Sequence, residues 1–432
     1  MRIAFQSVVL SALVAFPVYA DQVTKWNEIA TRASVASGLS GNPLFESRVY
    51  AMTHIAMHDA LNSIDRRYQT YAFHGTVMPT ASPDAAVAAA AHRVLTNQFA
   101  LLVTQGFAPQ QAMLDAELAT SLTLIPNGPA KTAGINLGIS AANAILQLRA
   151  GDGWNQQVVA DSGFPQGDTP GEWRFTPPND FAFLPQWGTL EPFSLFRANQ
   201  FRPSPPYRIN SKQYTADFNE VKALGGDGIT TPSTRTADQT EIARFWYESS
   251  PLGWNRIARA VAIQQGLGLW ENGRLFALLN IASADGYIAN FDSKYHFLYW
   301  RPITAIRLAA NDGNPNTVAD PTWTSLLVTP PVPDYSSGHA VQGAAMAEVM
   351  RLVFGSGNIS FTTCSTTMLS GENCGESSAA VRSFSSFWQA AEENALSRVL
   401  VGIHFRNATE EGLKHGRKIA HHVFVHDLRP LR

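Results

Sequence analysis

Helical periodicity dominates this chain and constrains its fold more than any other feature. Most of the sequence falls into segments whose apolar residues recur every three to four positions, the repeat of one buried helix face. The alternation that half-buried strands need is scarce. The sequence therefore predicts an all-α protein, with helices near 23–36, 43–64, 83–104, 109–123, 129–149, 236–248, 254–268, 270–290, 338–354, 377–401 and 408–425.

Residues 151–210 differ in composition and divide these helices. Pro, Gly and aromatic residues crowd there, as in Phe175-Thr-Pro-Pro178. Because Pro and Gly interrupt regular structure, we expect a long ordered loop or cap with aromatic anchors. It separates an N-terminal helical bundle, residues 21–150, from a C-terminal bundle, residues 211–432, and the length permits a single domain over 21–432.

The first twenty residues predict a secretory signal peptide. Arg2 precedes a short apolar run over 7–16, and small residues lead to an expected cleavage near Ala20. The alternative is a buried N-terminal helix. We expect a secreted or periplasmic protein that begins near Asp21.

Charge and hydropathy exclude some classes of partner. Asp and Glu number 34 against 32 Lys and Arg, which gives no reason to expect nucleic acid. Beyond the N-terminus no long uninterrupted apolar stretch occurs, so we expect no membrane span in the mature form. This counts against an integral lipid phosphatase.

Two cysteines, Cys364 and Cys374, lie ten residues apart in a loop rich in Ser, Thr and Gly. In an oxidising compartment such a pair is expected to form a disulfide. The alternatives are a zinc pair, for which the loop offers too few ligands, and a catalytic thiol, which needs an activating base.

A first pair of cations, Lys294 and Arg301, lies seven residues apart. If 295–300 is helical, two turns bring both to the same side, and Pro302 then changes the chain path. Two unpaired cations in an apolar neighbourhood repel each other unless an anion lies between them. The alternative is a solvated basic strip.

A helix start follows at Ser337-Gly338-His339. Ser337 stands where an N-cap belongs, Gly338 allows a ligand to approach the backbone, and free amides at a helix start favour anions. His339 can exchange a proton near neutral pH. The alternative is an ordinary capping serine with a surface histidine.

The third stretch contains Arg398 and His404. On a continuous helix six residues would turn His404 about 120° away from Arg398, so a break at Gly402 is needed to bring both to one ligand. The alternative is a histidine that merely ends a helix.

Together the three stretches, in this order and spacing, resemble the signature of vanadium-dependent haloperoxidases and type 2 phosphatidic acid phosphatases, over about the last third of the chain. Arg48–Leu61 is similar to a helix of bacterial haloperoxidases. The resemblance implies two packed four-helix bundles, with an oxyanion site in the C-terminal one.

The resemblance also implies roles for the residues. His404 would bond vanadium, or be phosphorylated in a phosphatase, and His339 would act as the acid/base residue. Lys294 would polarise hydrogen peroxide. The remaining contacts to the oxyanion would come from Lys294, Arg301, Ser337, Gly338 and Arg398.

The chain departs from the family pattern at several positions. Ser336 replaces a usual proline, and Ala408 stands where the phosphatases carry Asp, so Asn407 or a backbone carbonyl would have to hold the ring of His404. Phe291 and Val332 replace the Trp and Phe of fungal chloroperoxidases. Iodide or bromide is favoured because both are oxidised more easily than chloride.

The remaining histidines predict no metal site. His54 and His58 are four apart on a helix, but no third ligand is evident, and buried core histidines are the simpler interpretation. A solvated basic face is the interpretation for the last four, His415, His421, His422 and His426.

The sequence thus predicts a vanadate-dependent haloperoxidase that oxidises a halide with hydrogen peroxide to a hypohalous-acid equivalent, with a small organic acceptor as a further possible partner. The alternative is a secreted acid phosphatase that binds phosphate and uses His404 as its nucleophile. A third hypothesis is a non-catalytic phosphate- or vanadate-binding protein.

Overall fold

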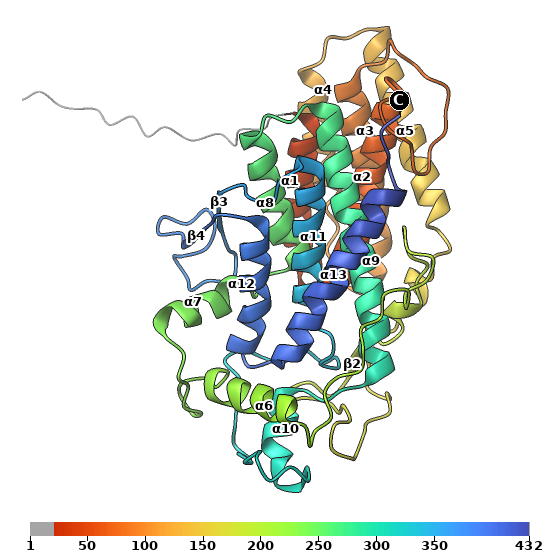
Figure 1. The fold of residues 1–432 in the computed structure, drawn as a ribbon. Helices are drawn as coiled ribbons and strands as arrows, with labels where there is room; N and C mark the ends of the chain where they lie inside the picture. Colours follow the sequence, from red (N-terminus) through yellow and green to blue (C-terminus); the bar gives the residue numbers. More distant parts are fainter. Residues whose placement is uncertain (1–20, 432) are drawn as a thin grey trace, which may run out of the picture.

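The computed structural model describes residues 21–431. The predicted signal peptide lies outside the described residues. The fold is all-α, as the periodicity predicts (Figure 1). The helices are α1 (Gln22–Ser37), α2 (Pro43–Asn62), α3 (Pro83–Leu102), α4 (Gln111–Thr123), α5 (Pro129–Leu148), α6 (Lys212–Leu224), α7 (Ala237–Phe245), α8 (Ser250–Gln264), α9 (Leu269–Phe297), α10 (Pro302–Leu308), α11 (Gly338–Phe354), α12 (Phe387–Leu400) and α13 (Arg406–His426). Two short antiparallel pairs join β1 (Ala160–Asp161) to β2 (Ala182–Phe183) and β3 (Phe361–Cys364) to β4 (Val381–Phe384).

The N-terminal bundle is built from α1 to α5. Helix α2 begins where Asn42 caps the amide of Phe45 and Pro43 occupies the first turn, and almost all of the helix is buried. Small residues let α3 and α5 pack closely: a Cβ at Gly138 would lie 2.2 Å from the carbonyl oxygen of Ala86. Replacing this glycine would push the two helices apart.

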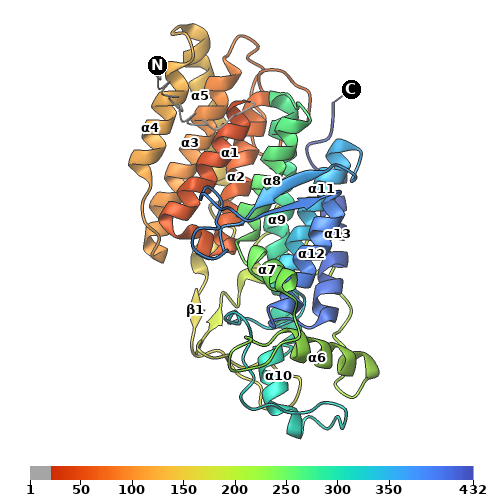
Figure 2. The same ribbon diagram turned by 90° about the vertical axis from the view of Figure 1, so that its left-hand side faces the viewer.

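The C-terminal bundle surrounds the long helix α9, which packs against α2 of the first bundle and α11 of the second (Figure 2). Helices α11 and α13 approach each other through small residues as well. A Cβ at Gly416 would lie 2.1 Å from the carbonyl oxygen of Val341. The extended core therefore runs through both bundles without interruption.

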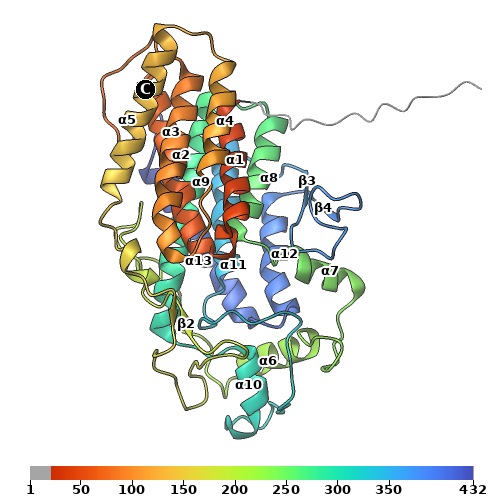
Figure 3. The same cartoon turned by 180° about the vertical axis from the view of Figure 1, so that it is seen from behind.

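The segment between α5 and α6 is irregular, with two short strands and two short 3-10 turns. It contains no α-helix in the part of the chain described, and buried carboxylates hold it in place. Asp285 on α9 accepts the amides of Phe193, Ser194 and Leu195 at 2.6 to 2.9 Å. Figures 1 to 3 all show α6, α10 and part of this segment gathered at one end of the bundles.

Three local expectations need correction. Helices α6 and α10 lie where periodicity predicted none. Helix α12 begins at Phe387 rather than near 377, because Val381–Phe384 pairs with β3 in a hairpin beside α12 (Figure 3). The disulfide is confirmed: Cys364 and Cys374 are bonded and close the loop of this hairpin.

One helical stretch in the described residues, 83–105, is long and apolar enough to span a membrane by length and composition. Of its most apolar window, 67% is buried inside the fold, as is typical of a core helix. The division into 21–150, 151–210 and 211–432 as parts of one domain stays a prediction.

Candidate functional site

A cavity of about 690 Å³ lies between the two bundles, beneath the cap. Its walls come from α2, α8 and α9, from the cap, and from the loop closed by the disulfide. The structure brings six of the predicted site residues to it: Lys294, Arg301, Gly338, His339, Arg398 and His404. Ser337, the seventh, is fully buried directly beside them.

Lys294 and Arg301 reach the cavity by a different route from the one expected. Helix α9 ends at Phe297, and Leu298 adopts a left-handed conformation with φ of 45°, so the two cations do not share a continuous helix. Arg301 instead stands at the N-cap of α10, before Pro302. The turn at Leu298 folds the chain back and delivers both cations to the same cavity.

Backbone carbonyls hold these two cations. Lys294 Nζ donates to the carbonyls of Pro333 and Asp334 at 2.7 and 3.0 Å. Arg301 donates to the carbonyls of Val332 and Ile403, both at 2.7 Å. Since carbonyls carry no net charge, these contacts neutralise neither cation, and the nearest carboxylate to Arg301 is that of Asp334, with Oδ1 3.8 Å from Nη1.

The start of α11 has the predicted geometry. Ser337 is the N-cap residue, but its side chain caps no backbone amide, and its buried Oγ lacks a hydrogen-bond partner among the described residues. The hydroxyl is therefore available to a ligand. His339 Nε2 lies 3.1 Å from the carbonyl oxygen of Glu248, which holds the ring at the cavity wall.

Arg398 and His404 come together because the chain breaks after α12, as predicted. The helix ends at Leu400, and Gly402 has φ of 87°, with the carbonyl oxygen of Gly225 only 2.4 Å from where a Cβ would stand. Arg398 Nη1 donates to the carbonyl of Trp246 at 3.2 Å. Its Nε is buried and has no partner within residues 21–431.

The ring of His404 has a neighbour that sequence reasoning missed. Asp334 Oδ1 lies 2.8 Å from Nδ1, whereas Arg301 Nη1 lies 3.0 Å from Nε2. The prediction that Asn407 or a backbone carbonyl holds the ring is therefore wrong. A carboxylate from the turn before α11 takes the place that Ala408 leaves vacant. The only signal in the sequence was an acidic residue in the proline-rich run before Ser337.

Burial dominates the electrostatics of the cavity. It lowers the pKa of Lys294 and of His339 well below their usual values, with neighbouring cations adding to the effect. Burial also lowers the pKa of Arg301 and of Arg398 to about 10. The pKa of Asp334 rises to about 7 through burial, opposed by Arg301 and Lys294. These shifts share one cause, which is the burial of ionisable groups in a dry site that favours the uncharged form of each group.

These features fit a bound oxyanion. Three buried cations face the buried carboxylate of Asp334, while Glu248, which also lines the cavity, is paired with Arg256. The site therefore carries excess positive charge that an anion would relieve. The partnerless Ser337 Oγ and Arg398 Nε are donors that a tetrahedral or trigonal anion would satisfy. A tetrahedral or trigonal oxyanion suits this donor set, and the ring of His404 lines the same cavity.

The other histidines take no part in such a site. His54 and His58 are buried and hydrogen-bonded to the carbonyls of Tyr50 and Gln69, which confirms them as core histidines. No cluster of three or more His, Cys, Asp or Glu that could hold a metal occurs in the residues described. The prediction that the last four histidines lie on a solvated face of α13 is wrong in part, because His415 and His422 are buried.

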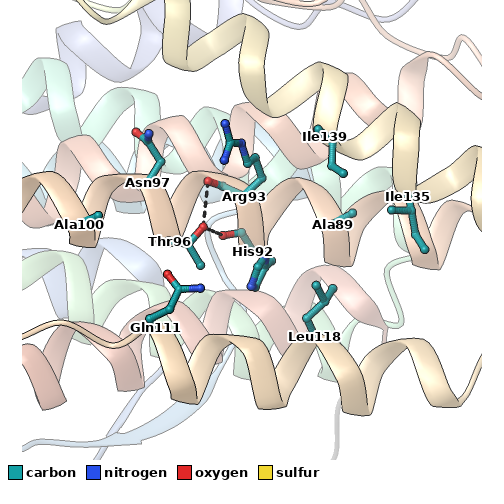
Figure 4. A pocket seen from close by; sticks show the side chains of 10 residues that line it. All are labelled: Ala89, His92, Arg93, Thr96, Asn97, Ala100, Gln111, Leu118, Ile135 and Ile139. Atoms are coloured by element: carbon teal, nitrogen blue, oxygen red, sulfur yellow. Dashed lines mark hydrogen bonds between the residues drawn. The ribbon is translucent and has the colours of Figure 1, made fainter.

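A second hollow, of about 550 Å³, lies between α3, α4 and α5 (Figure 4). Its polar side chains include His92, which contacts Asp115 at 2.7 Å, and Thr96, which bonds the carbonyls of its own helix. Arg93 is the one Lys or Arg side chain among its lining residues, so this hollow lacks the three cations that the first cavity contains.

The all-α fold and the buried cationic cavity define a class of oxyanion-binding proteins, and comparison with known proteins narrows it. Residues 274–431 match the family model of the second helical-bundle domain of vanadium chloroperoxidase. A vanadium chloroperoxidase of Curvularia inaequalis is 24% identical, over 88% of this chain and 78% of that protein.

Solved structures agree over nearly the whole chain. A bacterial vanadium-dependent iodoperoxidase matches with a TM-score of 0.76 and 25% identity, covering 96% of this chain and 98% of the other. The holo form of a bacterial vanadium-dependent chloroperoxidase has the same fold, with a TM-score of 0.72, 17% identity and coverage of 95% and 98%. The chain therefore resembles vanadium-dependent haloperoxidases, which are peroxidase-type oxidoreductases, in sequence over residues 274–431 and in fold over nearly its whole length.

Proposed function

We propose that this protein oxidises a halide with hydrogen peroxide to a hypohalous-acid equivalent, using vanadate held in the cationic cavity. The observation that carries the proposal is the convergence of Lys294, Arg301 and Arg398 on the ring of His404 in one buried cavity. Bound vanadate supplies a Lewis acid that activates hydrogen peroxide toward the halide.

The residues of the chain would do the remaining work. The three cations hold and neutralise the oxyanion, and the Ser337 hydroxyl and Gly338 amide donate hydrogen bonds to it. His339 lines the same cavity and is held through Nε2, which leaves its other ring nitrogen to move a proton. Lys294 adds positive charge where negative charge would develop on the peroxide oxygen.

Iodide or bromide is the proposed halide. The solved bacterial relative with 25% identity is an iodoperoxidase, and it matches more of this chain than the chloroperoxidase of Curvularia inaequalis does. The predicted signal peptide supports a secreted or periplasmic location, where hydrogen peroxide and halide would be met outside the cytoplasm.

A second candidate function is hydrolysis of phosphate esters, with phosphate in place of vanadate. The contact between Asp334 and His404 favours it, because a carboxylate beside an imidazole strengthens the ring as a nucleophile. The two functions share the site and differ in the anion that it holds.

A paired assay separates them. Purified protein stripped of bound anion is divided, and one part receives orthovanadate, hydrogen peroxide and iodide or bromide. The other receives a chromogenic phosphate ester without vanadate. We expect vanadate-dependent halide oxidation that is lost in His404→Ala. Ester hydrolysis that vanadate inhibits, with no halide oxidation, would make the phosphatase the function.

A further inference from the structure

The two ring nitrogens of His404 face groups of opposite hydrogen-bonding character. Nδ1 lies 2.8 Å from Oδ1 of Asp334, whereas Nη1 of Arg301 lies nearer to Nε2, at 3.0 Å, than to Nδ1, at 3.4 Å. A carboxylate accepts hydrogen bonds and a guanidinium only donates them. The surroundings therefore favour a proton on Nδ1 and a free lone pair on Nε2, the form that binds an electrophilic central atom.

The segment that carries Asp334 is tightly held. Its backbone amide donates to the carbonyl of Tyr299 at 2.9 Å, and its carbonyl accepts from Lys294 at 3.0 Å. Arg301 binds the carbonyl of Val332 two residues earlier. Two oxyanion-binding cations thus fix the backbone that places the carboxylate, and the side chain is fully buried.

The contact is short but is not aligned as a full hydrogen bond in this structure. We expect a small rotation of the imidazole ring to align Nδ1–H with the carboxylate of Asp334 and so to complete the hydrogen bond. Arg301 Nη1 occupies the Nε2 side of the ring here, and an oxyanion that drew this guanidinium to its own oxygens would free Nε2 to bond the central atom.

We propose that Asp334 is a positioning residue for His404, accepting the Nδ1 proton and thereby holding Nε2 toward the oxyanion. The inference rests on the proposed function for the identity of the anion. Asp334, in the turn before α11, would then orient the ring of His404. Residue 408 cannot do so, because it is a buried alanine with no hydrogen-bonding side chain.

A neighbouring carboxylate provides the matched control. Asp217 on α6 lines the same small cavity behind the site as Asp334, and it accepts the amide of Asn407 at 2.9 Å. Within residues 21–431 no hydrogen bond or ion pair joins Asp217 to His404, although its negative charge helps to raise the pKa of Asp334. Replacing Asp217 perturbs the same region without touching the imidazole.

The test compares wild type, Asp334→Ala, Asp334→Asn and Asp217→Asn. Affinity for orthovanadate and for inorganic phosphate is measured by calorimetry, with no peroxide or halide present. The imidazole N–H proton of His404 is followed by NMR in the phosphate complex of protein labelled with ¹⁵N-histidine. His404→Ala assigns the signal.

We expect Asp334→Ala to lose about 10- to 100-fold in affinity and to lose the downfield Nδ1–H signal. Asp334→Asn keeps an acceptor oxygen, so its loss should be smaller and the signal should move upfield. Asp217→Asn should keep the Nδ1–H signal and lose far less affinity than Asp334→Ala, because it removes a charge near Asp334 but leaves the carboxylate beside His404 in place. Wild-type affinity in both Asp334 variants, or an unchanged Nδ1–H signal in Asp334→Ala, would overturn the inference. Because binding is read without turnover, failure of halide oxidation would be a separate result.

Discussion

The disulfide loop forms one wall of the site, and opening it should act on His339. Thr366 and Thr367 of this loop line the cavity, and Thr366 donates through its amide and hydroxyl to the carboxylate of Glu248 at 3.1 and 2.9 Å. The carbonyl of the same Glu248 receives the Nε2 side of His339. Glu248 thus connects the disulfide loop to His339, the expected acid/base residue.

The size of the effect follows from the loop length. The cysteines are ten residues apart, so the chain-entropy relation gives the cross-link about 2.7 kcal/mol. Removing it with Cys364→Ser and Cys374→Ser should lower the free energy of local opening by about that amount. Since 1.36 kcal/mol is a factor of ten, amide exchange in residues 365–373 should quicken about 100-fold.

Hydrogen exchange read by mass spectrometry measures this directly. Peptides from α9 and α11 should keep wild-type protection, and halide oxidation should fall more than vanadate affinity, because His339 loosens while the cations stay in place. Thr362→Ala is the control, as it removes the exposed contact of the hairpin with Ser383 and leaves the cross-link intact. Unchanged exchange in 365–373 of the double variant would refute the reasoning.

Three further predictions concern stability. Phosphate or vanadate at 100 times its Kd should raise the free energy of unfolding by about 2.7 kcal/mol in urea titrations, and no change would mean that the folded site does not hold the anion. Asp152→Ala should lower this free energy by about 3–5 kcal/mol, because the carboxylate lies buried between Arg48 and Arg149 at 2.8 and 3.0 Å, whereas loss of the exposed Asp65 should cost less than about 1 kcal/mol. Burial lowers the pKa of His415 from 6.5 to about 3, so below pH 6.5 the unfolded chain binds a proton that the folded chain does not, and the fold loses stability as pH falls. His415→Leu should therefore gain about 2 kcal/mol over wild type between pH 7 and pH 5, and equal acid sensitivity would contradict this.

Helix periodicity carried most of the fold because each long helix buries one continuous face. It failed for α6, although Tyr214, Phe218 and Val221 of that helix are buried, and for α10, which is only seven residues long. It also failed for the start of α12, where a hairpin held by Cys364–Cys374 displaces a helical pattern. Short elements and cross-linked loops depend on tertiary contacts that no local pattern contains.

For the site, residue type and spacing predicted which side chains converge but not how. Lys294 and Arg301 meet through a left-handed turn at Leu298 rather than along one helix, and a leucine with positive φ gives no sequence signal. Asp334 was missed for a similar reason. Its partner His404 lies seventy residues away, and only the packing of the turn before α11 against the loop after α12 brings them together.

A crystal structure of the protein with orthovanadate tests the central claim most directly. We expect vanadium within bonding distance of His404 Nε2. The vanadate oxygens should contact the side chains of Lys294, Arg301 and Arg398 and accept a hydrogen bond from the Ser337 hydroxyl. Vanadate bound elsewhere, or bound in the cavity without a bond to His404, would contradict it.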